Sequence, residues 1–175
     1  MKAIRPFEPE DLRKFNVINL DRYTETYTTQ FYLQYKTNWP EYFQVAEAPD
    51  GTIMGYIMGK AEGRGENWHG HVTAISVAPE FRRMGLGREL MTRLEKISEE
   101  KNCYFVDLFV RVSNKVAVAM YESLGYVIYR RIIDYYTGDS PEDAYDMRKA
   151  LPIDVEKKST IPLKHPVHCN ELDED

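Results

Sequence analysis

Two glycines, Gly85 and Gly87, follow an apolar strand pattern that ends at Val77, and their spacing is the most informative in the chain. Glycine tolerates positive φ, so the backbone N–H groups of such a turn can converge on an anion. A helix is expected directly afterwards, and its N-terminus adds about half a positive charge. Arg82, Arg83 and Arg88 add full charges. The stretch therefore predicts a cradle for a phosphate group.

This cradle differs from two common nucleotide-binding motifs. A Rossmann fingerprint requires a third glycine where Leu90 stands, and a P-loop requires a Gly-Lys-Ser/Thr sequence that this turn lacks. An ordinary strand-to-helix turn with solvated arginines is the alternative interpretation. The predicted secondary structure around the turn must distinguish a phosphate cradle from an ordinary turn.

Hydrophobic periodicity predicts an α/β domain over residues 1–151 with a mixed sheet covered on both faces, followed by an extended tail over 152–175. The tail holds three prolines, six acids and three lysines and has no regular periodicity. Expected helical segments are 9–18, 31–35, 88–101 and 114–124, the last ended by Gly125; expected strands are 42–48, 53–61, 68–77, 104–110, 126–136 and 144–149.

Composition excludes several classes of protein. With 28 acidic against 23 basic residues the net charge is −5, which argues against direct nucleic-acid binding. We expect neither a membrane span nor a secretory signal, because no run of about 18 apolar residues occurs. The two cysteines, Cys103 and Cys169, form no disulfide framework, so a cytoplasmic location is expected.

Two histidines, His69 and His71, stand two residues apart on one expected strand, a spacing that can bind a metal ion. A third ligand is not placed nearby in the sequence, so we predict no metal site. A structural role is the expectation for His69.

The pattern R-x-x-G-x-G, followed by a helix, an apolar strand and N-x-x-A-x-x-x-Y-x-x-x-G-Y from Asn114 to Tyr126, resembles the GNAT superfamily of N-acetyltransferases. The resemblance implies a mostly antiparallel sheet of about seven strands flanked by about four helices. It also implies acetyl-CoA as cosubstrate. The coenzyme-binding residues that it implies are Val77, Arg82, Arg83, Gly85, Leu86, Gly87, Asn114 and Tyr121.

Further segments, among them N-L-D-R-Y-T-E-T-Y from Asn19 and W-H-G-H-V-T-A from Trp68, are similar to the catalytic subunits of NatB N-terminal acetyltransferases. That family acetylates the α-amino group of an initiator Met followed by Asp, Glu, Asn or Gln on nascent chains. It works with a large helical-repeat auxiliary subunit that docks on the ribosome. The resemblance therefore implies a heterodimer that reaches nascent polypeptide N-termini through its partner.

Acyl transfer from a thioester to an amine assigns roles to three side chains. Tyr121 can protonate the departing sulfur, and either Glu25 or His71 can accept a proton from the amine, directly or through water. The sequence does not rank these two bases. Residues expected to line the substrate cleft are Glu25, Tyr27, His71, Thr73, Tyr135 and Tyr136.

Two alternatives remain open. The first is a GNAT enzyme that acetylates lysine side chains or small amines, which would have the same coenzyme-binding residues. The second is a binding module that has the same fold but no catalytic turnover. The aromatic residues Phe15, Phe31, Tyr32 and Tyr35 suggest an apolar surface for a partner, because one small domain has limited need of them.

Overall fold

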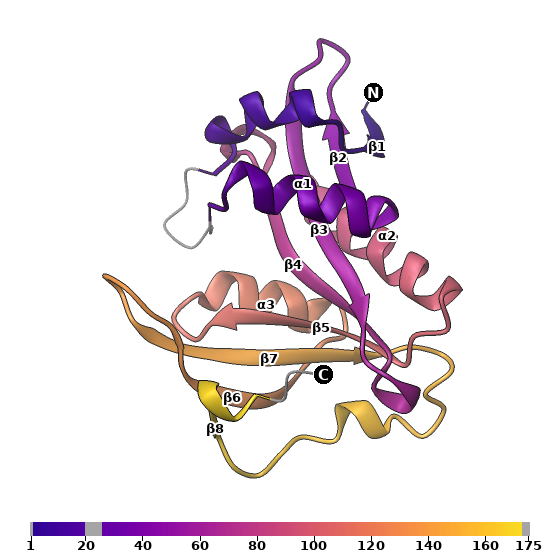
Figure 1. Cartoon of the computed structure of the whole chain (residues 1–175), viewed down its shortest axis with the longest axis vertical. Helices are drawn as coiled ribbons and strands as arrows, with labels where there is room; N and C mark the ends of the chain where they lie inside the picture. Colours follow the sequence, from indigo (N-terminus) through magenta and orange to yellow (C-terminus); the bar gives the residue numbers. More distant parts are fainter. Residues whose placement is uncertain (1, 20–25, 173–175) are drawn as a thin grey trace. The chain divides into compact units, whose positions relative to one another are not determined.

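The computed structural model describes residues 2–19 and 26–172. The chain forms two compact units, one from residues 1–60 with 72–97 and the other from residues 61–71 with 98–175. Strand β4 (His69–Val77) contributes its first three residues to the second unit and the rest to the first. Figure 1 traces the chain through these elements.

The first unit is a sheet in the order β1-β2-β3-β4 with helical segments packed on it. β1 pairs antiparallel with β2, and β2 pairs antiparallel with β3. The strands are β1 (Ala3–Pro6), β2 (Phe43–Glu47), β3 (Ile53–Glu62) and β4. The main helical segments are a 3₁₀ helix over Pro9–Val17, α1 (Thr29–Asn38) and α2 (Leu86–Glu100). The last two residues of β3 and the last three of α2 belong to the second unit.

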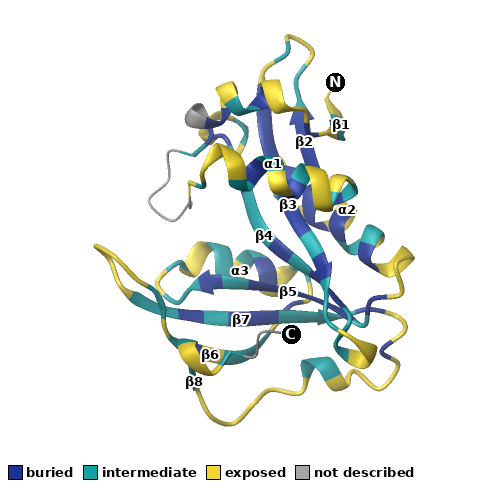
Figure 2. Cartoon of the chain, viewed as in Figure 1, coloured by how far each residue is buried: buried dark blue, intermediate teal, exposed yellow. Residues whose placement is uncertain are grey.

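Aromatic side chains fill the core of the first unit. Phe15 stacks on Tyr56 with ring centroids 4.2 Å apart, and its edge meets Tyr32 at 5.5 Å. Phe7 stacks on Phe43 at 3.9 Å. Figure 2 shows β2 and β3 buried along most of their length beneath helices that are exposed on their outer faces.

This packing corrects the expectation that the N-terminal aromatic residues form a partner surface. Phe15, Tyr32 and Tyr35 are buried in the core of their own unit, and Phe31 is half-buried against Tyr27. Local periodicity shows that a face is apolar but does not show what covers it, so the sequence pattern alone was misleading here.

The second unit continues from the start of β4 in the order β4-β5-β7-β6-β8. β7 pairs antiparallel with both β5 and β6, and the short β8 pairs parallel with β6. Its elements are β5 (Phe105–Arg111), α3 (Lys115–Ser123), β6 (Val127–Tyr136), β7 (Glu142–Ala150) and β8 (Val167–His168).

Sequence periodicity located most elements but missed two short strands. Periodicity located six of the eight strands in the described residues, because β1 and β8 are too short for an alternating pattern to identify them, and the count of about seven implied by the resemblance is one short. β8 lies in the segment expected to be an extended tail, and its residues belong to the second unit. Gly125 ends α3 with φ +99°, as predicted.

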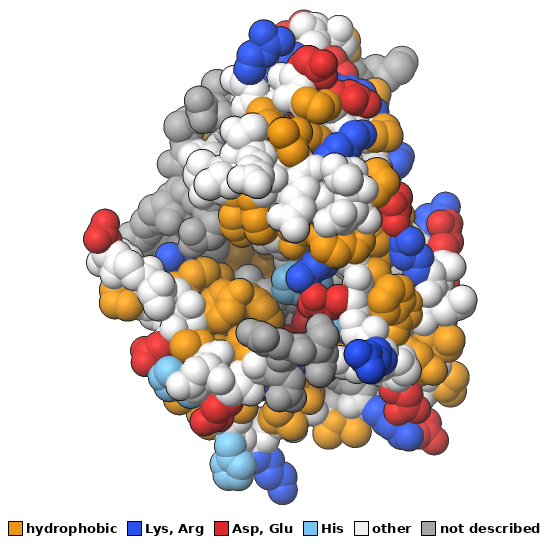
Figure 3. All heavy atoms as spheres, viewed as in Figure 1, with side chains coloured by type: hydrophobic (Ala, Val, Ile, Leu, Met, Phe, Trp, Pro, Cys, Tyr) orange, Lys and Arg blue, Asp and Glu red, His pale blue; other side chains and the backbone are white. Residues whose placement is uncertain are grey.

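Neither cysteine forms a disulfide, and Cys103 is buried. No helix among the described residues is long and apolar enough to cross a bilayer. Figure 3 shows acidic and basic side chains interspersed over the face in view, in keeping with a modest net charge of −5.

Replacing Phe15 tests whether this aromatic cluster carries the stability of the fold. We expect Phe15→Ala to lower the free energy of unfolding by about 3–5 kcal/mol, because a buried ring is removed and a cavity remains. Denaturant unfolding followed by circular dichroism measures this change. Val155→Ala is the control, since Val155 is 84% exposed. A small effect of Phe15→Ala on the free energy of unfolding would contradict this role and would favour a contact between Phe15 and a partner protein.

Candidate functional site

The predicted anion cradle lies in the first unit, between the end of β4 and the start of α2. The backbone takes left-handed conformations at Arg83 (φ +65°) and at Gly85 (φ +78°), so the chain turns sharply there. The Arg82 Nε–H donates to the carbonyl of Val77 at 3.1 Å and ties the turn to the end of β4. The turn therefore forms where it was expected, but Gly87 lies inside α2 and the second left-handed residue is Arg83, not Gly87.

Backbone donors of the helix α2 face the cradle. The Glu89 N–H donates to the carbonyl of Gly85 at 3.1 Å. The N–H groups of Leu86, Gly87 and Arg88 precede this bond in the first turn, where a helix has no internal acceptors. A Cβ built on Gly85 would meet no atom within 4 Å, which leaves room beside the turn. This geometry fits a phosphate group.

The side chains around the turn divide into one anchor and several exposed cations. Leu86 is buried and holds the start of α2 against the unit, whereas Arg82, Arg83 and Arg88 are exposed. Exposed cations attract an anion, but solvent and salt weaken their contribution. The oriented backbone is therefore the more specific part of the cradle.

Tyr121 lies in the second unit, on the inner face of α3. It is buried, and its ring meets that of Tyr126 edge to face at 6.1 Å. Burial raises the pKa of Tyr121 to about 12. The hydroxyl therefore keeps its proton at neutral pH and can donate it, as an acid must.

Asn114 has a structural task that the sequence did not reveal. Its side-chain oxygen accepts the Ala117 N–H at 3.3 Å and caps the N-terminus of α3. Capping of this kind stabilises a helix by about 1 kcal/mol. The coenzyme contact expected of Asn114 stays a prediction.

His71 begins a row of rings in the second unit. Its ring edge meets Phe109 at 5.2 Å, and Phe109 meets Tyr135 at 4.9 Å. Tyr135 in turn meets Tyr136 at 5.0 Å, and the guanidinium of Arg111 lies 4.1 Å above the Tyr136 ring. The structure thus brings together three of the residues expected to line the substrate cleft.

Tyr27 and Thr73 are linked within the first unit. The Tyr27 hydroxyl donates to the Thr73 carbonyl at 3.4 Å, and the Thr73 hydroxyl donates to the hydroxyl of Tyr35 at 2.8 Å. Because the Tyr35 hydroxyl accepts this hydrogen bond, the proton on its own oxygen can be directed to a further acceptor. Glu25, the other candidate base, lies outside the described residues.

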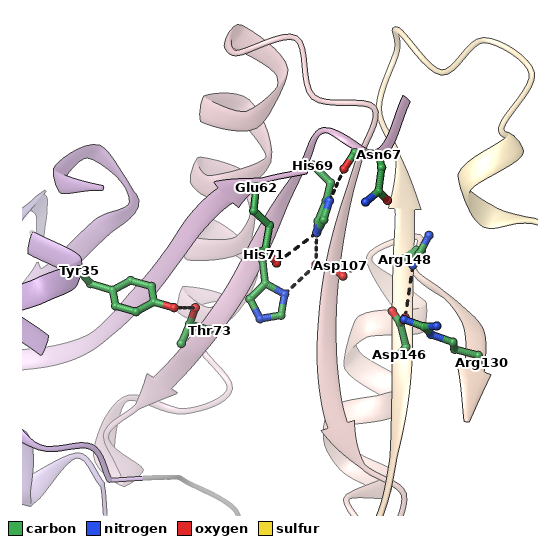
Figure 4. A network of polar contacts seen from close by, with 10 residues as sticks. All are labelled: Tyr35, Glu62, Asn67, His69, His71, Thr73, Asp107, Arg130, Asp146 and Arg148. Carbon is green, nitrogen blue, oxygen red and sulfur yellow. Dashed lines mark hydrogen bonds and ion pairs between the residues drawn. The ribbon is translucent and has the colours of Figure 1, made fainter. Parts of the chain in front are cut away.

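A buried carboxylate, Asp107 on β5, lies beside His71. Figure 4 shows both histidines of β4 directed toward it, His71 with Nδ1 at 2.7 Å from Oδ1 and His69 with Nε2 at 3.6 Å. Burial by itself would raise the pKa of Asp107, but the two histidines hold it below its usual range. Sequence reasoning missed this residue, although an acid inside the apolar run F-V-D-L-F-V was a usable signal.

His69 has acceptors on both ring nitrogens. Nδ1 donates to the Asn67 carbonyl at 2.6 Å, and Nε2 lies 3.5 Å from a carboxylate oxygen of Glu62. Burial would lower the pKa of His69, but the hydrogen bond with Glu62 and the charge of Asp107 raise it overall. The ring also stacks on Phe105 at 4.6 Å. This environment matches the expected structural role.

A second buried acid, Asp146 on β7, is flanked by Arg130 at 2.9 Å and Arg148 at 3.5 Å. Burial raises the pKa of Asp146, and the nearby Asp107 adds to the rise. The guanidinium of Arg148 lies 3.6 Å from the Tyr129 ring centroid. Within the described ranges, no three His, Cys, Asp or Glu side chains are grouped so as to hold a metal ion.

Comparison with known proteins gives a consistent picture. The model of the acetyltransferase (GNAT) family matches residues 12–126. The N-terminal acetyltransferase B complex catalytic subunit NAA20 of Arabidopsis thaliana is 57% identical over 176 residues, with 100% of both chains covered.

Solved structures agree with this. The crystal structure of Chaetomium thermophilum Naa20 in complex with a bisubstrate analogue is similar with a TM-score of 0.90 and 46% identity, covering 96% of this chain and 97% of that one. A structure of the NatB acetyltransferase complex bound to CoA and MES has a TM-score of 0.79 and 43% identity, covering 86% of this chain and 99% of that one.

The cradle can be tested by binding of coenzyme A. We expect Gly85→Val to weaken binding at least about tenfold, because valine avoids φ +78° and the backbone donors would turn away. Arg83→Ala should weaken binding less, since its exposed charge is screened. Isothermal titration calorimetry measures both.

Gly138→Val is the matched control, because Gly138 also has a positive φ, +97°, but lies between β6 and β7. Its affinity for coenzyme A should equal that of the unmodified protein. A larger loss in Arg83→Ala than in Gly85→Val would show that side-chain charge, not backbone geometry, holds the coenzyme.

Proposed function

The chain belongs to the GNAT family of acetyltransferases, among the catalytic subunits of NatB complexes, and we propose that it acetylates N-terminal methionine followed by Asp, Glu, Asn or Gln. The cosubstrate is acetyl-CoA, as expected for a chain whose neighbours are bound to CoA or to bisubstrate analogues. The observation that carries the proposal is full-length similarity to NatB catalytic subunits, together with the anion cradle at α2.

Different segments of the chain bind different parts of the coenzyme. The N–H groups at the start of α2 and the arginines of the turn hold the pyrophosphate of the coenzyme. β4 ends at Val77, immediately before that turn, and offers its edge to the pantetheine arm. The coenzyme supplies an acetyl thioester.

Two proton transfers accompany the reaction. The α-amine attacks the thioester carbonyl, a C–N bond forms, the C–S bond breaks, the nitrogen loses one proton and the sulfur gains one. Tyr121 supplies the proton for sulfur, since its raised pKa keeps the phenol protonated. His71 or Glu25 accepts the proton from nitrogen. A weak base is sufficient, because an α-amino group with a pKa near 8 is partly neutral at cytosolic pH.

Selectivity at the second substrate position follows from side-chain chemistry. Asp, Glu, Asn and Gln all present a carbonyl-type oxygen, and only two of them are charged. Hydrogen-bond donors without a full charge therefore suit all four. Thr73 stands two residues after His71 on β4, so both side chains are on the same face of that strand. Tyr27, Tyr135 and Tyr136 are the aromatic side chains that we propose contact the substrate methionine.

The partner follows from the same family membership. The chain acts in the cytoplasm as one subunit of a heterodimer, with a large helical-repeat subunit that brings it to the ribosome. Support comes from a net charge of −5, which by itself opposes approach to polyanionic ribosomal RNA. The apolar surface of the partner contact is not the aromatic cluster of the first unit, because that cluster is buried.

Peptide assays test the activity. We expect acetylation of Met-Asp and Met-Asn peptides with free N-termini and no acetylation of the same peptides with blocked N-termini and an internal lysine. Mass spectrometry of the product and release of free coenzyme A give two independent readouts. Acetylation of lysine in the blocked peptide would instead identify a lysine acetyltransferase.

Tyr121→Phe tests the acid. We expect kcat to fall by about tenfold or more with little change in the peptide KM, because the hydroxyl acts on sulfur only as the C–S bond breaks. In the unmodified enzyme, Tyr121 should cause no loss of rate below about pH 10, since ionisation begins only near its raised pKa of about 12. A wild-type kcat in Tyr121→Phe would leave Tyr121 with a packing role alone.

A further inference from the structure

The second unit contains a set of buried carboxylates, one of which determines where the proton of His71 lies. Asp107 has 7% of its side chain exposed and contacts both His71 and His69. Burying a carboxylate is costly unless cations and hydrogen bonds compensate for the lost water. The form of each histidine is therefore set by what the carboxylates around it require.

The contacts among these groups define which carboxylate faces His71. Three carboxylates belong to the set, Glu62, Asp107 and Asp146. Arg130 and Arg148 lie at Asp146, and Arg148 is also the cross-strand partner of Asp107. His69 faces oxygens through both ring nitrogens. Asp107 is the carboxylate that His71 contacts directly, with Nδ1 and Oδ1 2.7 Å apart.

A neutral histidine beside a carboxylate has one consistent tautomer. A carboxylate can only accept a hydrogen bond, so the proton of His71 must be on Nδ1, the atom 2.7 Å from Asp107. Nε2 then carries a lone pair and no proton. Phe109, the ring packed against His71 at 5.2 Å, offers no competing acceptor.

We propose that Asp107 is a positioning residue that holds the proton of His71 on Nδ1, so that His71 meets the substrate as a proton acceptor through Nε2. The proposal rests on the proposed acetyl transfer and deepens it. The proton lost by the α-amine passes to Nε2, directly or through one water, while the Nδ1–H bond to Asp107 is kept. The imidazolium formed is stabilised by the same carboxylate and then releases its proton to solvent.

This direction of hydrogen bonding changes how substrate selectivity is explained. Neutral His71 cannot donate to the side-chain oxygen of Asp or Asn in the substrate. The donors for that oxygen must come from hydroxyl or backbone groups, and the hydroxyl pair of Thr73 and Tyr35 is the available source of this kind near the same strand. Of the two bases left open by the sequence, His71 has a supporting carboxylate in Asp107, and Glu25 lies outside the described residues.

The pH dependence of the reaction tests the proposal. The groups that face His71 are Asp107 on β5, with His69 on β4, Glu62 on β3 and Arg148 on β7 around that carboxylate. In Asp107→Asn, loss of the negative charge should move the acid limb of kcat/KM to lower pH by about one unit. The plateau should fall about tenfold or more, because the amide also allows the tautomer with the proton on Nε2.

Asp146→Asn is the matched control, since Asp146 is an equally buried acid in the same sheet but does not contact His71. It should lower thermal stability and move the acid limb clearly less than Asp107→Asn does, because Asp146 has no contact with His71. The proposal would be overturned if the acid limb of the kcat/KM profile stayed in place in Asp107→Asn, or if it shifted equally in Asp146→Asn. Assays use the full chain purified with its partner subunit and a Met-Asp peptide.

A measurement on the unmodified protein avoids any dependence on variant folding. Nitrogen NMR of the histidine-labelled full chain near pH 8 should show His71 with a protonated Nδ1 and a bare Nε2, assigned by comparison with His71→Gln. A protonated Nε2 would overturn the proposal. A bare Nε2 in a protein that does not acetylate free N-termini would refute the proposed function and leave the tautomer assignment in place.

Discussion

The buried carboxylate of Asp107 is the constraint on which the arrangement of the second unit depends. An acid in the middle of a sheet must find cations in its own and neighbouring strands, and here they come from β4 and β7. Asp146 repeats this pairing with Arg130 on β6, its cross-strand partner. A slip of one residue would turn these side chains to the opposite face, so the charge pairs help to define the register.

In the first unit the corresponding constraint is backbone geometry. The turn before α2 needs left-handed conformations at Arg83 and Gly85, and only the second of these is a glycine. Non-glycine residues adopt that conformation at a cost in free energy, which is consistent with a turn maintained for binding. The buried Leu86 anchors the helix whose N-terminal amides face the turn. Gly85 thus shapes the binding turn, and the adjacent Leu86 packs in the core of the unit.

Residues of the same type have different contacts in this protein. His69 and His71 are close in sequence, yet one is stacked and held by acceptors on both nitrogens, whereas the other has a single acceptor on Nδ1. Tyr35 is buried but shares a hydroxyl pair with Thr73, and Tyr121 is buried in α3. Chemical roles therefore follow from the partners of each group and not from its residue type.

The sequence by itself determined the cradle, the helix of Tyr121 and the order of most strands, because glycine spacing, helix caps and alternation are local signals. It did not reveal that Asp107 supports His71, since the two are 36 residues apart and meet only when β4 and β5 lie together. It also placed Phe15 and Tyr32 at a surface, because periodicity does not identify the covering element. Asn114 similarly proved to be a helix cap. Long-range pairing and burial are properties of the folded chain, so only the tertiary structure decided them.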